Sequence, residues 1–126
     1  MKILLRRVNG DRLAYCQQDD NQLEILPSRN DLYMYDGSFS WGYKGTGCLS
    51  LAYAMAALFE GKDINVIDKY AKILLHNLIS GLDGNKEYSL DEAILLKVIK
   101  GEYIGPQHEQ KNYSLSDFIR PPTSSS

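Results

Sequence analysis

"GSFSWGYKGTGCLSLAYAMAALFEG", residues 37–61, joins a glycine-rich loop to the most apolar segment of the chain. Trp41 is the only tryptophan and stands among four closely spaced glycines, and positions 48–59 are then almost all apolar or alanine. A segment that is apolar on every side predicts a buried helix. We expect this helix to begin near Thr46, with the Thr46 hydroxyl as its N-terminal cap, and to stop at Gly61.

Three short segments with alternating apolar residues precede the loop and predict strands at 2–8, 12–18 and 22–26. Asn9 and Gly10 separate the first two. An Asn-Gly pair in this position is a strong hairpin signal, because a type I′ turn needs positive φ at both central residues. Pro27 ends the third strand, since proline has no N–H to donate to a sheet. The expected result is a three-stranded antiparallel meander.

A second helix is expected from about Ile64 to Ser80, with Asp63 as its N-cap and Gly81 as its stop. Apolar residues recur at helical spacing along it and mark its buried face. They are Ile64, Ile67, Ala71, Leu74, Leu75 and Leu78.

The sequence "SLDE" (89–92) predicts the start of a third helix. It matches a capping box, in which Ser89 would cap the helix and Glu92, three residues later, would bond back to it. Lys97 and Lys100 suit the negative C-terminal end of such a helix. Residues 87–88 are expected to be only a short extended link.

These elements together predict an α+β fold, with the N-terminal three-stranded antiparallel meander packed against about three helices. A chain of 126 residues suits one domain, which we place at residues 1–101, followed by an irregular C-terminal tail at 102–126. The apolar helix at 48–59 must be covered on all sides. A homodimer is expected on that ground.

Composition narrows the classes of partner. The net charge of -2 disfavours a nucleic-acid partner, because no basic excess is present to neutralise a phosphate backbone. The longest apolar run is too short to cross a membrane, and the N-terminus does not have the pattern of a signal peptide. Cys16 and Cys48 form no disulfide framework. The cytoplasm is therefore the expected compartment, without a membrane partner.

Candidate chemistry outside the glycine loop is sparse. His76 and His108 lack neighbouring ligands at metal-binding spacing, so no metal or other cofactor is expected. Cys48 would lie in the first turn of a helix, where the helix dipole lowers a thiol pKa, but no histidine lies nearby in the sequence to act as its base. The chain is accordingly expected not to be an enzyme, and no catalytic residue is assigned.

The glycine loop itself admits two interpretations. In the first it binds an anion: glycine amides form a concave donor set, the helix N-terminus points at the same place, and side chains add a charge, a hydroxyl and stacking rings. In the second, Phe39 and Trp41 anchor the loop to the core and the glycines allow a sharp turn. The spacing matches no known phosphate motif. The candidate ligand-binding residues are Trp41, Gly42, Tyr43, Lys44, Gly45, Thr46 and Gly47.

The same stretch resembles a family of small bacterial, archaeal and phage proteins classed as a domain of unknown function. The family pattern is Phe-x-Trp-Gly-Tyr-x-Gly-Ser-Gly followed by a buried helix. The matching residues are Phe39, Trp41, Gly42, Tyr43, Gly45, Thr46 and Gly47, preceded by Leu26, Pro27 and Arg29 and followed by Leu51 and Ala52. The resemblance extends over roughly residues 1–100. It implies a compact cytoplasmic domain often encoded on mobile elements, and it supplies no catalytic residues.

The sequence departs from the family pattern at two places, where "DGS" (36–38) replaces a Ser-Pro turn and "CLS" (48–50) replaces Pro-Ala-Gln. Any family role of that glutamine would be lost here.

Two functions follow as hypotheses. The first is a binding protein that holds a phosphate-bearing small molecule or nucleotide at the loop 41–47. The alternative is a protein-interaction or inhibitor protein of phage or mobile-element origin, which acts through its surface and its C-terminal tail. An enzyme that uses Cys48 or the loop is the least favoured.

Overall fold

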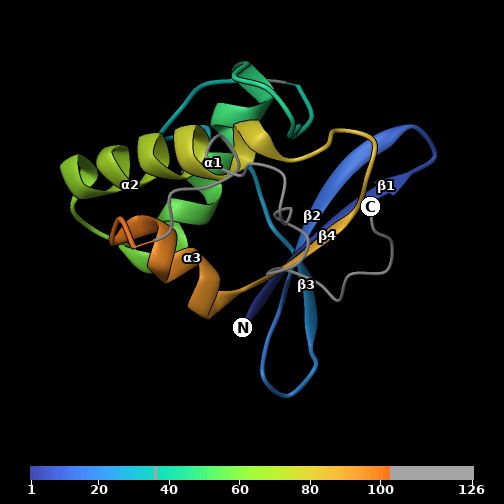
Figure 1. Cartoon of the computed structure of the whole chain (residues 1–126), viewed down its shortest axis with the longest axis horizontal. Coiled ribbons are helices and arrows are strands. Elements are labelled where there is room, and N and C mark those ends of the chain that lie inside the picture. The colour runs from blue at the N-terminus through green and yellow to red at the C-terminus, as the bar shows by residue number, and fades with distance from the viewer. Residues whose placement is uncertain (36, 103–126) are drawn as a thin grey trace.

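The computed structural model describes residues 1–35 and 37–102. Four strands form one antiparallel sheet, and helices gather on one side of it (Figure 1). The elements in order are β1 (Lys2–Val8), β2 (Asp11–Gln17), β3 (Leu23–Ile25), α1 (Thr46–Phe59), α2 (Ile64–Asn77), the 3₁₀ turn η1 (Ile79–Gly81), β4 (Tyr88–Asp91) and α3 (Glu92–Ile99). The α+β class is confirmed. The expected tail lies outside the described residues, apart from Glu102.

The hairpin between β1 and β2 forms as predicted. Val8 pairs with Asp11, which leaves Asn9 and Gly10 as a two-residue turn. Their φ angles are 52° and 87°. Positive φ at both positions is what a type I′ turn requires, and Asn and Gly tolerate it best.

The sheet contains a fourth strand that the sequence interpretation missed. Residues Tyr88–Asp91 form β4 and pair antiparallel with β1, so that the strand order is β3-β2-β1-β4. Tyr88 and Leu90 alternate into the core, and this period of two favours a strand. The predicted capping box is therefore wrong: Asp91 is the N-cap of α3, and no side chain caps that helix.

The ends of the other helices differ slightly from expectation. Gly45, not Thr46, is the N-cap of α1, and no side-chain hydrogen bond caps it. Asp63 caps α2 as predicted, because its carboxylate accepts hydrogen bonds from the amides of Asn65 and Val66. The α-helical hydrogen bonding of α2 ends at Asn77, and η1 occupies the remaining predicted turn.

A single buried cluster joins the sheet to the helices. Inward residues of the strands, such as Ile3 and Leu5, contribute to the same core as Leu51 and Met55 of α1, and all four have no exposed surface. Helix α1 is thus covered largely within one chain, from Gly47 to Ala56. Its apolar character therefore does not require a second copy, and the homodimer stays a prediction without that support.

Candidate functional site

Trp41 anchors the glycine-rich loop. Its side chain has no exposed surface, and its indole N–H donates to the carbonyl oxygen of Lys86 at 3.0 Å. Phe39, two residues earlier, is also buried. The anchoring role expected of these two aromatic residues is confirmed. Trp41 consequently presents no ring face on which a ligand could stack.

Two positions of the loop must be glycine, because backbone atoms of other residues lie too close to them for a side chain. Gly42 has a φ of 103°, and a Cβ atom there would lie 2.7 Å from the amide nitrogen of Gly84. A Cβ atom at Gly47 would lie 2.7 Å from the carbonyl oxygen of Ser38. Both separations are too short for a side chain, so these glycines allow the chain to fold tightly before α1. The structural interpretation of the loop is confirmed at these positions.

The remaining loop residues face solvent to different degrees. Tyr43 is 53% exposed, Lys44 and Thr46 are exposed, and Gly45 is half-buried. The seven predicted ligand-binding residues therefore divide into a buried structural part and an accessible part. Only the accessible residues remain candidates for ligand contact.

A polar hollow of about 280 Å³ lies beside this loop. It is bounded by the tip of the β1–β2 hairpin on one side and by Tyr35 and residues 38–43 on the other. The described residues that line it are Arg7, Gly10, Asp11, Arg12, Tyr35, Ser38, Phe39, Ser40 and Tyr43. Of the predicted site residues, Tyr43 alone belongs to this lining.

Arg12 connects three parts of the molecule at the hollow. Its Nη1 donates to Ser40 Oγ at 2.7 Å, and its Nη2 donates to the Gly84 carbonyl oxygen at 2.7 Å. The guanidinium carbon lies 5.6 Å from the centroid of the Trp41 ring, a cation–π distance. The Arg12 side chain therefore connects β2 to the glycine-rich loop and to the segment between η1 and β4, which contains Gly84.

Among the carboxylates that the structure describes, none forms an ion pair with Arg12. The Arg12 side chain is half-buried. Its hydrogen-bond partners are a hydroxyl and a carbonyl, which are both neutral. Charges that are withdrawn from water are usually paired. An anion in the hollow would supply the missing partner.

Arg7 adds a second positive charge to the same hollow. It pairs directly with Arg12 in the register of β1 and β2, and its guanidinium donates to the Asn85 carbonyl oxygen at 3.0 Å. Like charges that lie opposite each other across two strands destabilise a sheet. The described lining contains one carboxylate, Asp11, and beside it the Glu87 carboxylate accepts from the Arg7 backbone amide at 2.9 Å.

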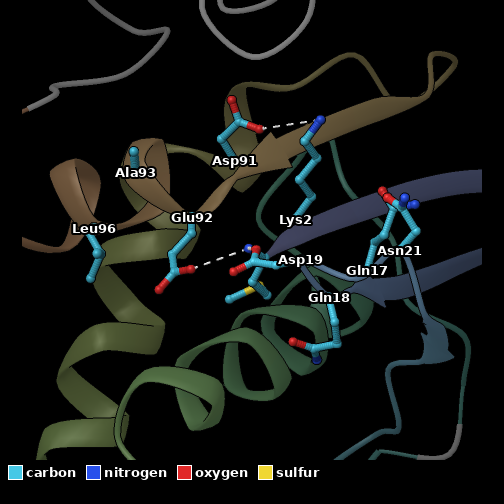
Figure 2. Close-up of a pocket in the computed structure, with 10 residues that line it drawn as sticks. Lys2, Gln17, Gln18, Asp19, Asn21, Asp91, Glu92, Ala93 and Leu96 are labelled. Carbon is cyan, nitrogen blue, oxygen red and sulfur yellow. Dashed lines mark hydrogen bonds and ion pairs between the residues drawn. The ribbon is translucent and has the colours of Figure 1, made fainter.

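A second, larger hollow of about 570 Å³ lies at the junction of the sheet and α3 (Figure 2). Its positive groups are already paired. The Met1 amine lies 2.8 Å from Asp19 Oδ1 and 3.5 Å from Glu92 Oε1, and Lys2 Nζ lies 4.0 Å from Asp91 Oδ1. The hydrogen bond from the amine lowers the pKa of Asp19 and raises that of the amine. The charges of this hollow are satisfied internally, so it gives no comparable argument for an anion.

The residues considered for catalysis lie elsewhere. Cys48 has no exposed surface and Cys16 is 5% exposed, and burial raises the pKa of the Cys16 thiol. Both are free cysteines. His76 lies on an exposed position of α2. Among the residues that the structure describes, no three histidine, cysteine, aspartate or glutamate side chains group as metal ligands.

Arg7 and Arg12 were missed as site residues, although the sequence contains a signal for them. In "RRVNGDR" (6–12) a hairpin centred on Asn9 and Gly10 must place residue 7 opposite residue 12. No such signal in the sequence indicates that Tyr35 and Ser38 line the hollow, because their position there depends on tertiary contacts with the hairpin.

Comparison of the chain with protein-family models, with curated proteins and with solved structures found no match. The family resemblance of the glycine-rich stretch therefore stays a prediction. Within the described ranges, no helix is both long and apolar enough to span a bilayer.

Proposed function

We propose that this protein binds a phosphate-bearing small molecule or a nucleotide in the polar hollow between the β1–β2 hairpin, Tyr35 and residues 38–43. The proposal rests on one observation: Arg7 and Arg12 lie opposite each other and line the same hollow, and Arg12 is half-buried without a carboxylate partner in the described chain.

The chemistry of the lining suits phosphate. A guanidinium group forms paired, charge-assisted hydrogen bonds to phosphate oxygens. The hydroxyl groups of Tyr35 and Ser38 add donors in the same lining. A volume of about 280 Å³ is at the small end for ligand pockets, which favours a phosphate with a small attached group held inside.

The exposed loop residues would contact the part of a ligand that extends beyond the hollow. Tyr43 lines the hollow and is 53% exposed, so its ring can stack against a base or another flat group. Lys44 and Thr46 follow it in an exposed segment and would add a charge and a hydroxyl. Trp41 would contribute indirectly, by holding the Arg12 guanidinium in place.

The test is calorimetric titration of the full chain with inorganic phosphate and with nucleoside mono-, di- and triphosphates. We expect Arg7→Gln to weaken binding by about tenfold or more, because a hydrogen bond to a charged group contributes roughly 1.5–3 kcal/mol. Arg7 is exposed, so this substitution leaves the core intact. Lys69→Gln removes the same charge from an exposed position of α2, a helix that contributes no described residue to the hollow, and should leave binding unchanged.

Two outcomes would contradict the proposal. One is the absence of binding by any of these compounds at millimolar concentration. The other is an equal loss of affinity in the Arg7 and Lys69 variants, which would show a general charge effect instead of a site.

The second candidate function is protein interaction, as an interaction or inhibitor protein of phage or mobile-element origin. It is favoured by exposed apolar side chains at the edge of the sheet, where Leu23 and Ile25 are 52% and 62% exposed. The part of this hypothesis that involves the C-terminal tail lies outside the described residues. For both functions we propose the cytoplasm as the compartment, in keeping with the two free cysteines.

A further inference from the structure

Strand β3 forms one edge of the sheet (Figure 1). It pairs with β2 on one side, and no described residue pairs with its other side. All three of its residues, Leu23, Glu24 and Ile25, are exposed. An exposed sheet edge is a template on which another extended segment can pair.

The hydrogen-bond register shows which backbone groups face this open edge. The amide of Leu26 donates to the Ala14 carbonyl oxygen at 2.8 Å, and the amide of Gln18 donates to the Gln22 carbonyl oxygen at 2.9 Å. Bonded and non-bonded pairs alternate along an antiparallel ladder. The bonded pair between these two is therefore Cys16 with Glu24.

Leu23 and Ile25 are consequently in non-bonded pairs with β2. Their N–H and C=O groups point away from the sheet, toward the open edge. These four backbone groups can form two complete hydrogen-bonded pairs with an incoming strand. Within the described ranges no backbone partner meets them.

The side chains of the edge define what kind of segment fits. Leu23 and Ile25 lie on the face of the sheet that the helices do not cover, and Ile25 continues a row with Tyr15 and Leu4 across the strands. Apolar residues on an incoming strand would extend this row. Glu24 lies on the other face and makes no ion pair in the described part of the chain.

A second copy of the chain fits this edge poorly. If two β3 strands paired antiparallel about a two-fold axis through their centres, Glu24 would lie directly opposite its own copy. Like charges that lie directly opposite each other across strands are destabilising. A lysine or arginine at that position would instead form a favourable cross-strand pair.

We propose that the β3 edge binds an extended segment of a partner protein, as an antiparallel fifth strand with an apolar–basic–apolar triplet. The two apolar residues would lie opposite Leu23 and Ile25, and the basic residue would lie opposite Glu24. Backbone hydrogen bonds give such strand addition its affinity, and the alternate side chains give it specificity.

The test uses two ten-residue peptides that differ only at their centre, Val-Lys-Val or Val-Glu-Val, titrated into the full chain and followed by amide NMR. We expect the lysine peptide to shift the amide signals of residues 22–26 and to slow hydrogen exchange at Leu23 and Ile25. Its affinity should exceed that of the glutamate peptide by at least about fivefold, a typical size for a charge-complementary cross-strand pair.

Matched variants separate the contributions of charge and backbone. Glu24→Lys should reverse the preference between the two peptides, whereas Glu102→Lys, the same change at an exposed position after α3, should not. Ile25→Pro should abolish binding and preserve the sheet, because it removes an N–H that points to the open edge and no hydrogen bond to β2.

Three results would overturn the proposal. The first is an absence of shifts at β3 with about 1 mM peptide, or equal affinity for both peptides. The second is protection of the Leu23 and Ile25 amides without peptide in a monomer, which would show that the chain's own residues 103–126 take the edge. The third is a dimer by sedimentation whose contact is β3.

Discussion

Gly42 shows how one residue positions the candidate site. Its φ of 103° disfavours any side chain, its amide donates to the Ile79 carbonyl oxygen at 3.0 Å, and the Gly84 backbone leaves no room for a Cβ atom. The chain passes through this point between the Trp41 anchor and the exposed Tyr43. The tight turn is therefore what allows one neighbour to be buried and the other to face the hollow.

We expect Gly42→Ala to destabilise the protein by at least about 1–3 kcal/mol, from backbone strain together with the clash against Gly84. Gly61→Ala is the matched control, because nothing lies within 4 Å of a Cβ atom there and its φ is not in the left-handed region. That change should be neutral or stabilising by up to about 1 kcal/mol. Chemical denaturation measures both, and equal effects at the two glycines would contradict the role given to Gly42.

Helices α1 and α2 are joined by a polar contact as well as by apolar packing. The Tyr53 hydroxyl of α1 donates to Asp68 Oδ1 of α2, and Lys72 Nζ lies 3.1 Å from the other carboxylate oxygen. The Tyr53 ring also stacks on Tyr33, with centroids 5.6 Å apart. Burial, followed by the bond to Asp68, raises the pKa of Tyr53 to about 12. The hydroxyl is therefore a donor across the whole ordinary pH range.

This contact predicts a pH dependence of stability. The Tyr53 hydroxyl, followed by Lys72, lowers the pKa of Asp68 below its usual value. A carboxyl with a depressed folded-state pKa stabilises the fold above its unfolded pKa, and the contribution is lost as pH falls through the folded value. Wild type should thus be more stable than Asp68→Asn at about pH 6, and the difference should begin to shrink as pH falls from about 4 toward about 3.

The Asp68 side chain is 42% exposed, so solvent screening keeps the effect below about 1 kcal/mol. Thermal melts of the two proteins between these pH values measure it. A difference that stays constant from about pH 6 to about pH 3 would contradict the assignment.

Local signals predicted the elements well, whereas partners distant in the sequence were missed. Asn9 and Gly10 determine their own hairpin, because the turn geometry depends on those two residues alone. Strand β4 escaped prediction because its partner β1 lies more than 80 residues earlier, and because "SLDE" also satisfies the local rule for a helix cap. Ser89 therefore lies in a strand, although its local sequence matches that of a helix cap.

The candidate site was predictable to a similar extent. The glycine loop was identified as the place of interest, and Tyr43 does line a hollow there. The hydrogen bonds of Trp41 to Lys86 and of Arg12 to Gly84 join residues 45 and 72 positions apart, and no periodicity in the sequence encodes them. For that reason the candidate site in the structure lies between the loop and the hairpin, whereas the sequence predicted it in the loop itself.

At the level of the whole molecule, Trp41 lies where sheet, loop and helices meet. The buried residues of the described chain extend from Ile3 to Val98 in one cluster. Gly101, with a φ of 80°, then closes α3, and its amide donates to the Val98 carbonyl oxygen at 3.0 Å. The core thus includes residues from both ends of this range, and β4, which pairs with β1, directly precedes α3.

We therefore expect residues 1–102 to fold without the remaining 24 residues and to unfold as a single unit. Trp41 is the only tryptophan and has no exposed surface, so its fluorescence reports on the centre of the fold, while far-UV circular dichroism reports on the helices and strands. Coincident transitions from the two signals are the mark of two-state unfolding. The midpoint of the truncated chain should lie within about 4–8 °C of that of the full chain, the shift that about 1 kcal/mol produces in a domain of this size.

Separate transitions would show that the sheet and the helices are independent. A much larger fall in the midpoint, with the Trp41 emission shifted toward that of exposed tryptophan, would show that the core depends on residues 103–126.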